Sequence, residues 1–142
     1  MNSITRSIST ALAIGALVAA TACGDSTSPE QAIAGVYPLA TLNGQTVPFV
    51  FFQNEAGRVR VLAGSLSLRS DRSYTQTMNV ESTFFFAPEL SRNNTNTENG
   101  TYIVEGTTIV FNMANGPSYQ GAIVPGRSVT YVFDGDAATF RR

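Results

Sequence analysis

Apolar and polar residues alternate along most of the chain from residue 34 onward, in short runs separated by turn residues. In residues 73–86 the odd positions are largely polar, while the even positions are mostly apolar: Tyr74, Met78, Val80, Phe84 and Phe86. This period of two is typical of a β-strand buried on one face, and it directs the even set toward a core. Residues 109–113 and 129–133 repeat the pattern. The sequence therefore predicts an all-β domain without an amphipathic helix.

Turn residues divide this domain into nine predicted strands that follow one another closely. Pairs such as Asn43-Gly44 and Asp134-Gly135 favour tight two-residue hairpins. The predicted strands are residues 36–42, 45–53, 58–68, 73–86, 100–104, 108–113, 119–124, 128–133 and 138–141. Because a Greek key would need long crossovers, these connections favour a small antiparallel up-and-down meander barrel of about eight or nine strands. The one long loop is expected at residues 87–98, a polar stretch rich in Asn and Thr.

The apolar positions change parity within residues 58–68. Val59 and Val61 are odd, whereas Leu66 and Leu68 are even. A shift by one residue is what a β-bulge produces, so we expect a bulge at Ala63-Gly64. Such a bulge bends the strand and favours closure into a barrel.

Two segments, residues 47–52 and 84–86, are apolar on both strand faces. Whichever face is buried, some large aromatic side chains must point the other way. Ordinary core and loop packing is one interpretation. A ligand mouth, a partner surface and a membrane-facing patch are the others.

The N-terminus has the layout of a secretory signal peptide. Residues 8–20 form an apolar run after a single Arg6, and as a helix this run would reach about 20 Å, short of the roughly 30 Å hydrocarbon core. The following Ala20-Thr21-Ala22-Cys23 resembles the lipobox of bacterial lipoproteins, although Ala20 stands where that motif usually has Leu. The alternative is an ordinary signal peptide cut after Ala22.

The lipobox resemblance implies an exported protein that is lipid-anchored at Cys23, with the outer membrane of a Gram-negative-type envelope as the expected location. Stable anchoring needs two or more acyl chains, which the lipoprotein modification supplies. The chain then divides into a signal peptide (residues 1–22), a flexible tether (residues 23–32) and a barrel domain (residues 33–142). The tether is expected because residues 24–31 contain no apolar side chain that could pack.

The ends of the domain carry a second resemblance. Gly35-Val36-Tyr37 opens the first strand and Phe140-Arg141-Arg142 closes the last, which is similar to lipocalin-like barrels, where a Gly-x-aromatic opening is packed by a late Arg. The departure is Tyr37 where lipocalins typically have Trp. The resemblance implies a barrel whose interior holds a small apolar molecule, with Tyr37 and Arg141 as a structural pair that seals one end.

The chain offers little for catalysis. It has no His, one Cys and a formal net charge of −1, and all nine basic residues are Arg. The commonest general base and metal ligand are therefore absent, and a nearly neutral domain has no electrostatic footprint for nucleic acid. Asp134-Gly135-Asp136 is the tightest acidic pair, but calcium needs six to eight oxygen ligands, so we interpret it as a turn. We expect no enzyme, no cofactor and no metal.

Two functions remain open. In the first, the barrel binds a small hydrophobic or amphipathic molecule, with Tyr74 and Met78 lining the interior and Phe84 and Phe86 near its mouth beside the loop at residues 87–98. In the second, the barrel is filled by its own side chains, and exposed aromatic residues contact another envelope protein.

The lipid anchor is directly testable through its thiol. Replacing Cys23 with Ser should remove the lipidation site and leave the protein soluble or unprocessed. Membrane fractionation of the wild type and the C23S variant measures this. Unchanged partition of the variant into the membrane fraction would contradict the assignment.

Overall fold

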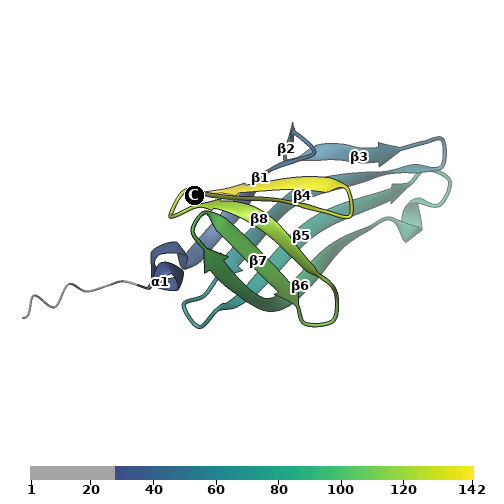
Figure 1. The fold of residues 1–142 in the computed structure, drawn as a ribbon. Coiled ribbons are helices and arrows are strands. Elements are labelled where there is room, and N and C mark those ends of the chain that lie inside the picture. Colours follow the sequence, from purple (N-terminus) through teal and green to yellow (C-terminus); the bar gives the residue numbers. More distant parts are fainter. Residues whose placement is uncertain (1–27) are drawn as a thin grey trace, which may run out of the picture.

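Residues 28–142, which a computed structural model describes, form a closed antiparallel barrel of eight strands with two further strands at its rim (Figure 1). The strands are β1 (Gly35–Leu42), β2 (Gln45–Thr46), β3 (Phe49–Gln53), β4 (Gly57–Leu68), β5 (Ser73–Phe84), β6 (Arg92–Glu105), β7 (Thr108–Met113), β8 (Ser118–Val124), β9 (Ser128–Phe133) and β10 (Asp136–Arg141). Strands take up 68% of these residues and helix 7%, which confirms the all-β prediction.

The strands follow an up-and-down order, and β1 closes the barrel. The sheet runs β2-β1-β10-β9-β8-β7-β6-β5-β4-β3, with an additional pairing of β1 with β4. The first half of β1 pairs with β4, from Gly35–Leu68 to Pro38–Ser65, while its second half pairs with β10. The predicted meander barrel is therefore confirmed. The structure has ten strands where nine were predicted, because the expected strand 45–53 is divided into β2 and β3 around Pro48.

The prediction of a long loop at residues 87–98 is wrong. After the short 3-10 helix η1 (Pro88–Leu90), strand β6 begins at Arg92 and pairs with β5 from Ser82–Arg92 to Ser73–Thr101. The segment gave no strand signal because its inward positions, including Asn96 and Glu98, are as polar as its outward ones.

The predicted bulge is present in β4. The register with β5 passes from Val61–Val80 to Ala63–Asn79, so Leu62 is the extra residue. It lies just before the Ala63-Gly64 position inferred from the change of parity, and β4 continues through it without interruption. A bulge leaves the strand paired while it reverses which parity faces the interior.

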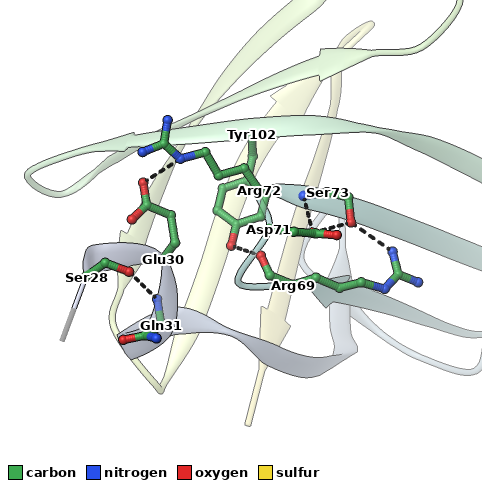
Figure 2. A network of polar contacts seen from close by, with 8 residues as sticks. All are labelled: Ser28, Glu30, Gln31, Arg69, Asp71, Arg72, Ser73 and Tyr102. Atoms are coloured by element: carbon green, nitrogen blue, oxygen red, sulfur yellow. Dashed lines mark hydrogen bonds and ion pairs between the residues drawn. The ribbon is translucent and has the colours of Figure 1, made fainter.

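A short helix, α1 (Pro29–Ile33), precedes the barrel, so the predicted tether is wrong from Pro29 onward. Ser28 caps it, accepting a hydrogen bond at 3.3 Å from the backbone N–H of Gln31. A polar contact and apolar packing together hold the helix: the Glu30 carboxylate lies 3.0 Å from Arg72 (Figure 2), and Ile33 is buried in the core. Residues 23–27 with Cys23, and the predicted signal peptide, lie outside the described residues.

Tyr37 is sealed by Arg142 and not, as predicted, by Arg141. The Arg142 guanidinium lies 5.0 Å from the centre of the Tyr37 ring and donates a hydrogen bond of 2.8 Å to the carbonyl of Ala34. Alternation along β10 buries Phe140 and exposes Arg141, and the next residue, after the strand end, folds back over Tyr37. Gly35 leaves the space, since a Cβ there would lie 1.3 Å from Arg142 Nη2.

Truncating these two neighbouring arginines should have different effects on stability. Arg142→Ala removes a cation–π contact and a charged hydrogen bond, and should lower the free energy of unfolding by about 1–2 kcal/mol. Arg141→Ala, at an exposed position of the last strand, should change it by less than about 0.5 kcal/mol. Urea unfolding of both variants measures the difference, and equal losses would contradict the assignment of Arg142.

Candidate functional site

The two halves of the barrel differ in how they are filled. The half next to α1 is a packed hydrophobic core, because strand register brings together large, almost fully buried side chains there. They are Tyr37, Leu66, Leu68, Tyr102, Ile109, Ile123, Val129 and Phe140. The hydroxyl of Tyr37 donates a hydrogen bond of 2.7 Å to the carbonyl of Ile33. The hydroxyl of Tyr102 donates one of 2.6 Å to the carbonyl of Arg69. Figure 2 shows the Arg69–Ser73 turn and α1 on either side of Tyr102.

The other half holds a cavity of about 360 Å³. Its apolar wall comes from eight side chains: Leu42, Phe51, Val59, Val61, Met78, Val80, Phe133 and Ala138. Its polar wall comes from Gln76, Asn96, Glu98, Asp134 and Asp136. Small-molecule sites occupy about 300–1,000 Å³, so this cavity suits a small ligand. A second hollow of about 490 Å³ shares Gln76, Met78, Asn96 and Glu98 and continues toward the turn between β7 and β8.

Glu98 lies at the centre of a hydrogen-bond network at the base of the cavity. Its Oε1 accepts from the hydroxyl of Tyr74 at 2.5 Å and from that of Tyr119 at 2.6 Å. The pairing of β5 with β6 sets Gln76 opposite Glu98, and Gln76 Oε1 accepts from the hydroxyl of Tyr131. Oε2 of Glu98 makes no hydrogen bond with any residue between 28 and 142. The network therefore fixes the carboxylate of this lining residue and leaves its second oxygen without a hydrogen bond from residues 28–142.

The phenols of this network are held in their protonated form. Burial is the largest cause that raises the pKa of Tyr74, Tyr119 and Tyr131, and the Glu98 carboxylate raises each of them further. Burial likewise raises the pKa of Tyr102 to about 12. At neutral pH the tyrosine hydroxyls therefore donate to Glu98 and Gln76, and the cavity presents amide groups and carboxylate oxygens to a ligand. This arrangement can bind and orient a polar group on a ligand.

The predicted ligand-binding residues fall in different places. Met78 lines the cavity, and Tyr74 is buried beneath it with its hydroxyl on Glu98. Phe84 lies in a separate hollow of about 180 Å³, and Phe86 is 84% exposed. These two phenylalanines, predicted near the mouth of the interior, do not line this cavity, since β5 ends at Phe84 and both side chains are exposed. Phe51 of β3 lines the cavity instead.

Sequence reasoning missed the polar wall. Glu98 shares its parity with Tyr102 and Val104 of the same strand, and this was the available signal that it faces inward. The Asp134-Gly135 pair does form the expected turn, with positive φ angles of 50° and 88°. Asp136 Oδ1 accepts a hydrogen bond of 2.8 Å from Asn43. Across residues 28–142, no three His, Cys, Asp or Glu side chains are grouped to hold a metal ion.

Comparison of the chain with protein-family models and with curated proteins gives no match. Among the described residues, α1 and η1 are too short to cross a membrane as helices.

Alkaline titration should report the buried phenols. The pKa of all five tyrosines is raised above the ordinary value of 10.0. Above pH 10 the unfolded chain releases phenolic protons that the folded chain retains, so the free energy of unfolding should fall as pH rises from about 10 to 12. Near-ultraviolet phenolate absorbance, followed together with circular dichroism, should rise only as the barrel unfolds. A full phenolate signal at pH 10 from folded protein would contradict this.

Proposed function

We propose that this protein is a lipid-anchored lipoprotein of the bacterial cell envelope that binds a small hydrophobic or amphipathic molecule inside its barrel and has no enzymatic activity. The observation that carries the proposal is the cavity of about 360 Å³ in the half of the barrel away from α1. A barrel built for stability alone would fill this volume with side chains, as small barrels usually do.

The position of the proposed anchor, Cys23, relative to the cavity supports an anchored binding protein. Cys23 precedes Pro29, the first residue of α1, by six positions. A link of that length reaches at most about 20 Å, so an anchor on Cys23 would keep the α1 end near the membrane. The cavity lies in the opposite half, where it would face away from the membrane and remain accessible to a ligand.

The chemistry of the cavity supports binding rather than catalysis. Its phenols are buried donors with raised pKa values, and its central carboxylate already accepts two hydrogen bonds on one oxygen. Such groups recognise a ligand but do not form the pair of activated nucleophile and base that covalent catalysis requires.

A second candidate function rests on a different surface, the Phe wing, formed by Phe51, Phe52, Phe84, Phe85 and Phe86. Each of these side chains is at least 40% exposed. Figure 1 shows β3, which supplies two of them, far from α1. Exposed aromatic clusters mark protein-contact surfaces, so the wing favours an envelope protein partner. The two functions are compatible, and the cavity is the stronger observation.

Filling the cavity should weaken ligand binding. The uncharged fluorescent dye prodan should bind the purified domain with a blue-shifted emission, and Met78→Trp should weaken this binding at least about tenfold by occupying the space. Asn79→Trp adds the same side chain to the exposed face of the same strand and serves as the matched control. Fluorescence titration measures the affinities, and circular dichroism verifies that both variants fold.

The Phe wing supplies the opposing outcome. If prodan binding survives Met78→Trp but is lost when Phe85 and Phe86 are both replaced by Ser, the dye occupies the wing. That result would contradict the cavity as the binding site and favour the second candidate function.

A further inference from the structure

We propose that the cavity selects cationic amphipathic molecules, such as a primary amine attached to a small apolar group, over anionic ones such as fatty acids. This inference rests on the proposed binding function and specifies the class of ligand. It is carried by the sign of the charges that line an otherwise apolar space.

Every charged side chain in the cavity wall that the structure describes is acidic. Glu98 lies at its base, and Asp134 and Asp136 line it from the β9–β10 turn. No Arg lines either this cavity or the adjoining hollow within residues 28–142. An anionic head group would therefore be buried among like charges without a partner, which is strongly unfavourable at low dielectric.

The arginines of the described chain are engaged or placed elsewhere. Arg60 pairs with Glu81 at 3.2 Å, Arg72 pairs with Glu30, and Arg142 covers Tyr37. The chain has no Lys and no His. The protein therefore supplies no positive charge of its own to neutralise the cavity, and a ligand that carries one would complete it.

Glu98 is prepared to accept such a ligand. Its Oε1 is fixed by the hydroxyls of Tyr74 and Tyr119, which orients the carboxylate before any ligand arrives. Its Oε2, which makes no hydrogen bond within residues 28–142, is the acceptor for an ammonium N–H. Preorganised charge-assisted hydrogen bonds of this kind are stronger than those between neutral groups.

The aromatic wall points to the same ligand charge independently. The ring centres of Tyr119 and Phe133 lie 4.9 Å apart, and those of Tyr119 and Tyr131 lie 5.0 Å apart, and all three rings line the cavity. Aromatic faces carry negative partial charge and attract cations. An apolar tail can pack on Val61 and Val80 while its ammonium group lies near Glu98 and these rings.

Three probes with one tail and different head groups test the proposal on the purified domain. They are octylammonium, octanoate and 1-octanol, which are cationic, anionic and neutral. Calorimetric titration should give octylammonium the tightest binding, about tenfold or more tighter than octanoate, with 1-octanol between them.

Variants locate the source of the preference. Glu98→Gln should lower the affinity for octylammonium about fivefold or more while changing that for 1-octanol by less than about twofold, because its amide oxygen can still accept from the two tyrosines. Glu105→Gln makes the same change at the exposed end of the same strand and should have no effect. Asp134→Asn is a second cavity variant that keeps the turn, since Asn tolerates the positive φ at this position.

Each remaining outcome contradicts a defined part of the argument. Binding of 1-octanol with octylammonium no tighter than octanoate would overturn the preference for cations and leave the binding cavity intact. A preference for octylammonium that survives both Glu98→Gln and Asp134→Asn would overturn the role of the cavity carboxylates. No binding of any probe would overturn the proposed function and this inference with it.

Discussion

The structure depends on one strand that hydrogen-bonds to two neighbours. β1 pairs with β4 through residues Gly35 to Pro38 and with β10 from Leu39 to Leu42, and this shared pairing turns an open meander into a barrel. Closure pairs the backbone groups of residues 35–38 with those of residues 65–68, which would otherwise lie at sheet edges. It also explains the chemistry at the start of β1, where Gly35 leaves room for Arg142 to cover Tyr37 next to the seam.

The interior of the closed barrel has two halves that differ in the side chains pointing inward. Near α1 the inward side chains are large and apolar, and they supply the burial that stabilises a domain without disulfides. In the other half the inward positions of β5 and β6 become Gln76, Asn96 and Glu98, and a cavity takes the place of a core. The tyrosines between the halves serve both, because their rings belong to the core and their hydroxyls orient Glu98.

The sequence predicted the parts of the fold that follow local rules. Turn pairs such as Asn43-Gly44 and the alternation in residues 73–80 were sufficient for strand order, the meander and the inward face of β5. Arg142 and α1 were missed because they are held by contacts between residues far apart in sequence, Arg142 with Ala34 and Glu30 with Arg72. No periodic pattern contains that information.

The largest error, the loop expected at residues 87–98, coincides with the candidate site. A strand is recognised by its apolar face, and β6 lacks one in its first half because there its inner residues face a cavity instead of a packed core. Natural sequences depart from such local rules mainly where function requires it. Apolar residues at Asn96 and Glu98 would fill the barrel and bury more surface, as in its other half. That the chain carries polar side chains at these inward positions is an argument, independent of the cavity's size, that this end of the barrel serves recognition rather than stability.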